Sequence, residues 1–312
     1  MRAAVLGGSG FIGSHLVDRL LALGQDVVVV DDFSTGRRSN LAHLAGNARV
    51  QILEWDICKP IPVVGPLTTV WNFASPASPI DYARRPIETL EVGSLGVKNA
   101  CELAERAGAT LVHASTSEVY GDPLVHPQRE DYFGNVNPIG PRACYDESKR
   151  FAEAYITSFA RARGLPCQLG RIFNTYGPRM REEDGRVIPA FACQALDGKD
   201  FTVFGDGSQT RSFTYVDDLL DGFLLLRAKG DGQPVNLGNP NEMTLVQLAD
   251  IIRQVAGSGG KVVSVRPLPE NDPKQRKPDI ARAQSLLGWQ PKVPLHEGLK
   301  PTLEWYRKHR AK

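Results

Sequence analysis

The sequence predicts an α/β protein built on a doubly wound parallel sheet. Strand-like and helix-like hydrophobic patterns alternate through the first half of the 312 residues. A glycine-rich turn also joins the first predicted strand to the first predicted helix. Alternating strands and helices favour a parallel sheet that is covered by helices on both faces.

The chain opens with a strand, a turn, a helix and a second strand. Residues 2–6 form a short apolar strand, and the helical period that follows ends at Gly24. The next strand begins after Asp26 with four valines, a run typical of strands buried on both faces. Glycines that permit close approach of a pyrophosphate to a helix N-terminus predict a Rossmann-type dinucleotide site. These glycines have a G-x-x-G-x-x-G spacing, at Gly7, Gly10 and Gly13.

The same alternation continues until about Gly177, after which loops lengthen and Pro, Gly and Arg become frequent. We therefore predict a nucleotide-binding Rossmann domain over 1–176. A smaller, interleaved substrate-binding region over 177–312 follows without a clean linker. The other expected elements are strands at 49–54, 69–74, 109–115 and 166–171, and helices at 87–107, 142–163 and 244–256.

Asp31 ends the second predicted strand and bears on the choice of cofactor. A carboxylate at this place accepts hydrogen bonds from the ribose hydroxyls and repels a 2′-phosphate, so it favours NAD over NADP. Arg37 and Arg38 follow closely and are the alternative, because guanidinium groups bind phosphate.

Tyr145 and Lys149 stand four residues apart in the predicted helix 142–163. The phenol and the ammonium group therefore share one helix face. A nearby cation favours phenolate, so we expect the pKa of Tyr145 to fall from about 10 and the phenol to serve as a general base. A solvated helix face is the common alternative for such a pair, and the dinucleotide site argues against it.

A run of small hydroxyl residues follows the predicted strand 109–115. Strand C-termini in open parallel sheets face the ligand crevice, so this run offers hydroxyls and one carboxylate to a polar substrate. Ser and Thr also cap helices, which is the structural alternative. The run is Ser115, Thr116, Ser117 and Glu118.

Composition excludes several classes of function. Hydrophobic residues make up 42% and charged residues 23%, and the formal net charge of +2 argues against a nucleic-acid or membrane-surface partner. The five cysteines have no metal-binding spacing, so we expect no metal and free thiols. No signal peptide or apolar run near 18 residues is evident, which predicts a cytoplasmic protein without a membrane segment.

The second half carries several arginines in or near predicted loops. Arg binds phosphate oxygens in a bidentate manner, so some of these residues suit a diphosphate substrate, whereas others are expected to be ordinary surface residues. They are Arg179, Arg181, Arg186, Arg211, Arg266 and Arg276.

With these motifs in place, the chain resembles the extended short-chain dehydrogenase/reductase family of nucleotide-sugar enzymes. Within that family it is most similar to the UDP-glucuronate decarboxylases, also called UDP-xylose synthases. The resemblance covers nearly the whole chain. Its most specific segments are A-S-P-A-S-P at 74–79, A-S-T-S-E-V-Y-G-D-P at 114–123, N-P-I-G-P-R-A-C-Y-D-E-S-K-R at 137–150, R-I-F-N-T-Y-G-P-R-M at 171–180, D-G-R-V at 184–187 and Q-R-K-P-D-I at 275–280.

The resemblance implies a set of site residues. The implied catalytic residues are Tyr145, Lys149, Thr116, Glu118 and Ser117. The implied NAD-binding residues are Gly7, Gly10, Phe11, Ile12, Gly13, Asp31, Asp32, Phe33, Thr35, Gly36, Asp56, Ile57, Phe73, Ala74, Asn99, Ser115, Tyr145, Lys149 and Thr175. The implied residues for the UDP-sugar are Asn174, Arg186, Phe204, Arg211 and Arg276.

The resemblance also implies a reaction. Tyr145 takes the proton of the sugar 4-hydroxyl while hydride passes from C4 to NAD⁺, the resulting β-keto acid loses CO₂, and C4 is then reduced again. Arg211 and an ordered water are both candidates for the C5 proton donor. Related 4,6-dehydratases have an acidic Asp where this chain has Ser117, and serine is too weak an acid for their chemistry. The alternatives are a 4-epimerase of a UDP-hexose or UDP-uronate and, remotely, an inactive NAD-binding sensor.

Quaternary structure is implied by the family alone. There, helices corresponding to 87–107 and 142–163 pair across a two-fold axis, so the resemblance implies a homodimer.

Overall fold

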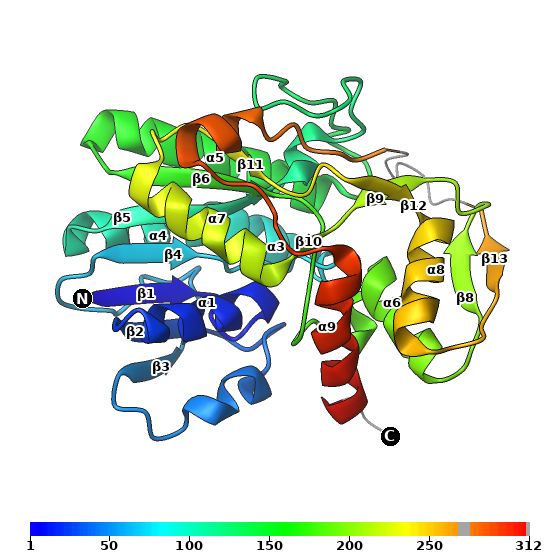
Figure 1. Ribbon diagram of the computed structural model, residues 1–312. Helices are drawn as coiled ribbons and strands as arrows, with labels where there is room; N and C mark the ends of the chain where they lie inside the picture. The colour runs from blue at the N-terminus through cyan, green and yellow to red at the C-terminus, as the bar shows by residue number, and fades with distance from the viewer. Residues whose placement is uncertain (268–274, 310–312) are drawn as a thin grey trace.

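The computed structural model describes residues 1–267 and 275–309 and has a central sheet of seven parallel strands (Figure 1), which confirms the predicted fold class. The order across the sheet is β11-β6-β5-β4-β1-β2-β3. Six strands lie where the sequence predicts them, whereas β11 was missed because three residues give no readable period. The strands are β1 (Arg2–Leu6), β2 (Asp26–Asp31), β3 (Val50–Glu54), β4 (Thr69–Asn72), β5 (Thr110–Thr116), β6 (Cys167–Ile172) and β11 (Val235–Leu237).

Helices cover both faces of this sheet because the strand side chains alternate between two apolar cores. Ala3 and Val5 of β1 belong to the core beneath α1 and α7, whereas Ala4 and Leu6 belong to the core beneath α4 and α5. The flanking helices are α1 (Phe11–Ala22) and α7 (Val216–Lys229) on one face, and α4 (Val97–Ala107) and α5 (Ala143–Arg163) on the other.

The predicted helix 87–107 is one continuous helical segment with a wider turn inside it. It comprises α3 (Pro86–Glu91), a π-helical turn over Val92–Gly96, and α4. α4 and α5 end on Gly108 and Gly164, which adopt φ values of 64° and 73°. Glycine pays no Cβ penalty in this left-handed region, so both helices stop there.

β1 lies at the topological switch point of the sheet. Its parallel neighbours are β2 on one side and β4 on the other. The sheet therefore extends from β1 in one direction through β2 and in the opposite direction through β4. In open sheets of this kind the ligand crevice lies outside the carboxyl ends of the strands at the switch point. The fold therefore brings the glycine turn after β1 together with the residues that follow β4 and β5.

A smaller group of elements lies beside the sheet in Figure 1 and has its own apolar core. The predicted helix 244–256 is α8, and a capping box begins it: the Thr244 side chain accepts the Gln247 N–H, and the Gln247 side chain accepts the Thr244 N–H. β11 and α7 also come after residue 176, but they pack on the central sheet and not with this smaller group. The division of the chain into domains at residue 176 stays a prediction. The group contains α6 (Val187–Leu196), β8 (Phe201–Phe204), α8 (Leu245–Ala256), β13 (Val262–Arg266) and α9 (Leu295–His309).

Short elements complete the fold. Within the described residues, no helix is both long and apolar enough to cross a lipid bilayer. The short elements are α2 (Pro79–Arg84), β7 (Thr175–Tyr176), β9 (Thr210–Ser212), β10 (Thr214–Tyr215) and β12 (Glu242–Thr244).

Candidate active site

Two adjoining pockets form one long crevice at the carboxyl ends of the strands. The first extends from the glycine turn past Thr116 and Tyr145 to Arg186, and the second extends from the glycine turn past Asp31 to Asp56. The residues that line both pockets are Gly7, Gly10, Thr35, Phe73 and Ser75. The crevice is therefore continuous across the switch point.

The glycine turn fits a pyrophosphate. A Cβ atom added at Gly10 would have a single neighbour within 4 Å, the Gly7 carbonyl oxygen, so it would project into the crevice. No side chain caps the amino end of α1, so its first N–H groups are available to an anion. Gly13 is required for close packing, because a Cβ there would lie 2.1 Å from the Gly7 oxygen.

Asp31 lies buried in the second pocket and holds the turn in shape. Its carboxylate accepts the N–H groups of Ser9 at 2.8 Å and Phe33 at 2.9 Å. Burial raises the pKa of this carboxyl group, while those hydrogen bonds oppose the rise. Gly36 faces the same carboxylate, since a Cβ at Gly36 would lie 3.0 Å from the Asp31 Oδ1.

Most other expected cofactor residues line the crevice. Phe33 and Asn99 do not: Phe33 lies 3.8 Å beneath the Arg38 guanidinium, and the Asn99 amide donates to the Ile57 carbonyl at 2.8 Å. Phe33 thus contacts Arg38, Asn99 contacts Ile57, and neither side chain lines the crevice. The remaining members that line one or both pockets are Phe11, Ile12, Asp32, Thr35, Asp56, Ile57, Phe73, Ala74, Ser115, Tyr145, Lys149 and Thr175.

Tyr145 and Lys149 project from the first turns of α5 into the first pocket. The Tyr145 ring stacks on Tyr82, with ring centroids 5.1 Å apart and planes 10° apart. The Lys149 Nζ donates to the Ala114 carbonyl at 2.9 Å and lies 5.9 Å from the Tyr145 ring centroid. These contacts fix both side chains beside the end of β5.

The pKa of Tyr145 shifts in the direction opposite to our expectation. Burial raises it to about 12, although the Arg186 guanidinium and a hydrogen bond with Thr116 oppose the rise. Burial also lowers the pKa of Lys149 to about 8. Loss of hydration outweighs the charges and hydrogen bonds around each group, which the sequence pattern could not reveal.

Glu118 lies at the centre of an arginine cluster. The Arg276 Nη2 donates to its carboxylate at 2.9 Å, its Nη1 donates to the second oxygen, and the Arg142 Nη2 donates at 2.5 Å. Burial alone would raise the pKa of Glu118, but the two guanidinium groups lower it to about 2. Glu118 therefore stays ionised and has no proton to donate at neutral pH.

The hydroxyl run ends β5 and also caps a helical turn, which confirms the capping alternative, whereas its contact with a substrate stays a prediction. The Thr116 Oγ1 accepts the Glu118 N–H at 3.3 Å and caps a 3₁₀ turn over Ser117–Tyr120. All of the hydroxyls line the first pocket. Ser117 is buried beside them.

Asn174 and Arg186 line the first pocket, as the resemblance implies. The Asn174 Nδ2 is buried and has no hydrogen-bond acceptor among the described residues. Arg186 pairs with Asp184 at 2.9 Å. Phe204, Arg211 and Arg276 do not line this pocket, and the Arg266 side chain lies outside what the structure describes.

Positive charge predominates in the first pocket, which suits an anionic ligand. The lining cations are Arg37, Arg142, Arg179, Arg181, Arg186 and Lys149, against the carboxylates Asp81, Glu118 and Asp184. Sequence reasoning did not single out Tyr82, Arg142 or Asp184. Arg142 could have been found, because it precedes Tyr145 by one helical turn, whereas the position of Tyr82 carries no sequence signal.

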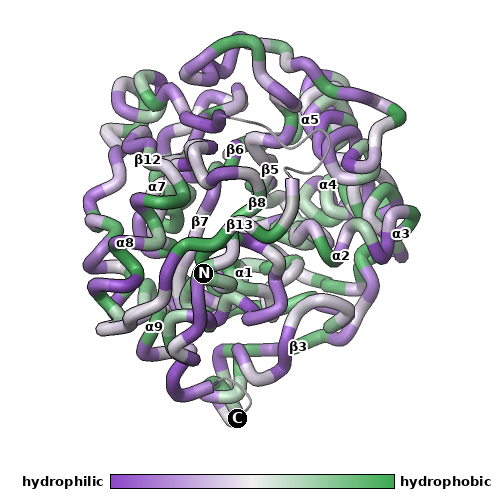
Figure 2. Tube along the Cα trace, turned by 90° about the vertical axis from the view of Figure 1, so that its right-hand side faces the viewer, coloured by the Kyte–Doolittle hydropathy of each residue, from purple (hydrophilic) through white to green (hydrophobic). Residues whose placement is uncertain are grey.

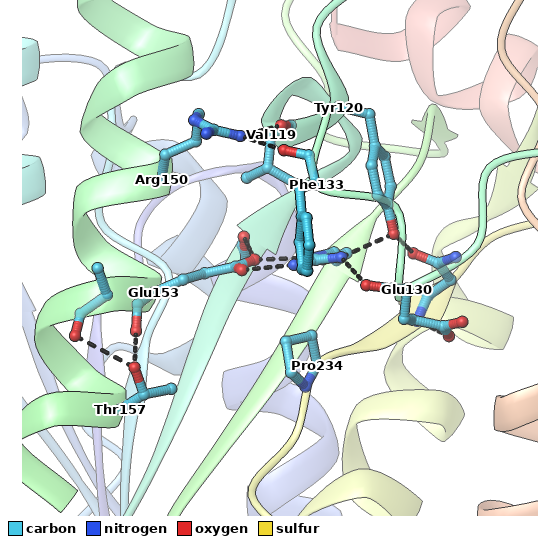
Figure 3. Close-up of polar contacts among 12 residues, drawn as sticks. Val119, Tyr120, Glu130, Phe133, Arg150, Glu153, Thr157 and Pro234 are labelled. Carbon is cyan, nitrogen blue, oxygen red and sulfur yellow. Dashed lines mark hydrogen bonds and ion pairs between the residues drawn. The ribbon is translucent and has the colours of Figure 1, made fainter. Parts of the chain in front are cut away.

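A buried polar network fixes α5 behind the pocket (Figure 3). Glu153, which follows Lys149 by one turn, accepts from the Arg171 Nε at 2.9 Å and Nη2 at 2.7 Å. It also accepts the Ser115 hydroxyl at 2.5 Å. The Arg171 Nη1 donates to the Tyr120 hydroxyl at 2.9 Å, so the network reaches from α5 to the loop after β5.

Comparison with known proteins agrees with this geometry. The model of the NAD dependent epimerase/dehydratase family matches residues 3–238. The chain belongs to this family. It is 49% identical over 307 residues to UDP-glucuronic acid decarboxylase 1 of Xenopus tropicalis, covering 98% of this chain and 72% of that protein. It is 47% identical to UDP-glucuronic acid decarboxylase 3 of Arabidopsis thaliana, covering 97% of this chain and 88% of that protein.

Solved structures of the family share the whole fold. UDP-glucose 4-epimerase of Thermotoga maritima has a TM-score of 0.89 at 32% identity, covering 99% of both chains. UDP-glucuronic acid 4-epimerase of Bacillus cereus, solved with UDP-glucuronic acid and NAD, has a TM-score of 0.86 at 26% identity and covers 99% of both chains.

We predict that the protein binds NAD⁺ more tightly than NADP⁺, by about tenfold or more. A 2′-phosphate would meet the buried Asp31 carboxylate, a repulsion on the order of 1–2 kcal/mol or more. Titration calorimetry of the two cofactors tests this. Asp31→Asn should narrow the preference more than Asp32→Asn, a neighbouring and exposed carboxylate. Equal or tighter NADP⁺ binding would contradict the prediction and favour a role for Arg37 and Arg38.

Glu153→Gln should lower the free energy of unfolding by about 3 kcal/mol, because it leaves the buried Arg171 guanidinium without its counter-ion. Urea unfolding monitored by circular dichroism measures the change. Glu147→Gln is the matched control, since Glu147 lies on the same helix and pairs with Arg150 at a partly exposed position. Equal stability of the two variants would show that the network does not hold α5.

Proposed function

We propose that the protein converts UDP-glucuronate to UDP-xylose and CO₂ with NAD as a recycled cofactor. Identities of 45–49% to UDP-glucuronic acid decarboxylases over nearly the whole chain carry this proposal. The excess of arginine in the first pocket supports it, because UDP-glucuronate brings a diphosphate and a carboxylate. The glycine turn, α1 and Asp31 are the groups that would hold NAD.

The chain supplies a base for oxidation at C4. Tyr145 takes the proton of the 4-hydroxyl and returns it at the end, while Thr116 and Lys149 orient the phenol and its surroundings. NAD held there would supply the hydride acceptor and donor for C4, and the positive charge of its oxidised form would favour the phenolate. A positive charge beside the phenol, added to that of Arg186, therefore offsets the rise in the Tyr145 pKa that burial causes.

Decarboxylation follows from the 4-ketone. The C6 carboxylate lies β to this ketone, so the C5–C6 bond breaks with its electrons delocalised into the carbonyl. Glu118 holds the Arg142 and Arg276 side chains in place in this step. It does not donate a proton, since its pKa is about 2. Ser117 is too weak an acid to expel a 6-hydroxyl, which argues against a 4,6-dehydratase.

A 4-epimerase of a UDP-hexose or UDP-uronate is the alternative. It is favoured by the close structural similarity to 4-epimerases, including a UDP-glucuronic acid 4-epimerase, but these share only 26–32% identity with the chain. Such an enzyme would use the same Tyr145 and Lys149 and would leave the carboxylate on the sugar.

We also propose that the protein is a homodimer formed through α3 and α5. Apolar side chains are exposed along these helices, and apolar, green segments lie beside the α3 label at the edge of the molecule in Figure 2. A face of this kind favours burial in an isologous interface. The exposed residues are Ile87, Leu90, Leu95 and Phe151.

We propose further that the protein acts in a reducing compartment such as the cytoplasm. The free state of the five cysteines supports this proposal.

UDP-glucuronate should yield UDP-xylose and CO₂ without added NADH. Mass spectrometry of the nucleotide product decides between the candidates, because an epimerase product keeps the mass of its substrate.

Tyr145→Phe keeps the ring that stacks on Tyr82 and should lower the rate by about 10²-fold or more while preserving NAD⁺ binding. A product of unchanged mass would overturn the decarboxylase proposal, and near-normal turnover of the variant would place the base elsewhere.

Leu95→Glu should convert the dimer to monomer, because it places a charge in the apolar face of the π-helical turn. Light scattering coupled to size exclusion measures the mass. Val64→Glu is the control, since Val64 is 77% exposed on a loop away from these helices. A monomeric wild-type protein, or a Leu95→Glu protein that stays dimeric, would refute the proposed interface.

A further inference from the structure

Asp146, the residue after Tyr145, has a buried carboxyl group that the mechanism above does not use. Its Oδ1 atom makes no hydrogen bond among the described residues, and its Oδ2 lies 3.9 Å from the Arg142 Nε. Buried carboxylates are normally paired or fully hydrogen-bonded, because their desolvation is costly. Asp146 lies in the first turn of α5, where an acid suits the helix dipole, but that position does not supply a partner for its Oδ1 atom.

The surroundings of Asp146 allow it to exchange a proton near neutral pH. Burial and the negative charge of Glu118 raise the pKa of Asp146 to about 7, while Arg142 and Arg276 oppose the rise. The Asp146 carboxyl group is neutral below that pH and charged above it. Several charged and titratable groups act on Asp146 or feel its charge. They are Arg142 at the N-cap of α5, Cys144, Tyr145 and Glu147 on α5, Glu118 after β5, Arg276, and Tyr82 on α2.

A separate pocket reaches Asp146, which does not line the sugar pocket. Glu118 and Arg142 line this pocket and also the first pocket, whereas Asp146 lines this one alone. The Glu118–Arg142 pair thus forms the boundary between the two spaces. The other lining residues are Gly121, Asp122, Asn135, Val136, Asn137, Gly140 and Pro141.

The proposed reaction consumes one proton that its own steps do not provide. The proton that Tyr145 removes from O4 returns to O4 when C4 is reduced. When the C5–C6 bond breaks, its electron pair moves into the C4 carbonyl as an enolate. A new C5–H bond must then form with a proton that replaces CO₂. Each turnover therefore draws one proton from solvent into the crevice.

We propose that Asp146 is the proton store for this step and that the separate pocket refills it from solvent. The O–H bond of the neutral carboxyl group breaks as the C5–H bond forms, and Asp146 is left as the carboxylate until solvent protonates it again. Water carries the proton across the Glu118–Arg142 boundary, since Asp146 does not line the sugar pocket. Asp146 is in this sense a positioning residue that acts through water. The inference rests on the proposed decarboxylation.

Asp146→Asn in the NAD-loaded protein tests the store, because asparagine keeps the shape and cannot supply the proton. In single-turnover mixing with UDP-glucuronate, we expect NADH absorbance to rise and CO₂ to appear at rates within about threefold of wild type. The NADH should then persist about 10²-fold longer, since the enolate waits for its proton before C4 can be reduced. Glu147→Gln removes only the smaller of the two negative charges that raise the pKa of Asp146, so its NADH decay should stay within about threefold of wild type.

The wild-type protein provides a second readout that does not depend on the variant. Because Asp146 loses its proton as pH rises through about 7, the decay of NADH should slow over that interval, and in Asp146→Asn this dependence should vanish. NADH decay in Asp146→Asn as fast as in Glu147→Gln, or wild-type decay that is independent of pH between 6 and 8, would overturn the inference alone. A wild-type protein that releases no CO₂ would overturn the proposed function, and the inference with it.

Discussion

The attachment of α5 to the end of β5 is the constraint on which the rest of the site depends. The Lys149 ammonium donates to the Ala114 carbonyl of β5, and Glu153, one turn later, accepts from the Ser115 hydroxyl and from Arg171 of β6. These contacts place two consecutive turns of one helix against two strands. The phenol of Tyr145 therefore has a defined position relative to the glycine turn, which follows a different strand.

The same attachment sets the electrostatics of the site. Tyr145 and Lys149 are buried where α5 packs against the sheet. This loss of hydration raises the pKa of Tyr145 and lowers the pKa of Lys149. The free protein therefore disfavours phenolate. The Arg186 guanidinium lowers the pKa of Tyr145 but does not overcome burial, so ionisation of the phenol needs a further positive charge beside it.

Carboxylates close to one another have separate roles because their partners differ. Glu118 has two guanidinium partners and remains ionised, so it organises Arg142 and Arg276. Asp146 lies 3.9 Å from Arg142 of the same cluster, and its Oδ1 makes no hydrogen bond within the described part of the chain. The charge of Glu118 favours its neutral form. Like charges held close together in a buried site cannot all remain ionised. Glu118 therefore keeps its negative charge beside two guanidinium groups, whereas the pKa of Asp146 is raised.

The sequence alone determined the fold class, six of the seven sheet strands, the glycine turn and the Tyr145–Lys149 pair, because each of these follows from local periodicity or spacing. Tertiary structure decided what depends on contacts between distant segments. The stacking of Tyr82 on Tyr145 joins residues 63 positions apart, and the pairing of Arg276 with Glu118 joins residues 158 apart. The pKa directions also belong to this second group, because desolvation depends on which side chains surround a charge and not on its neighbours in the chain.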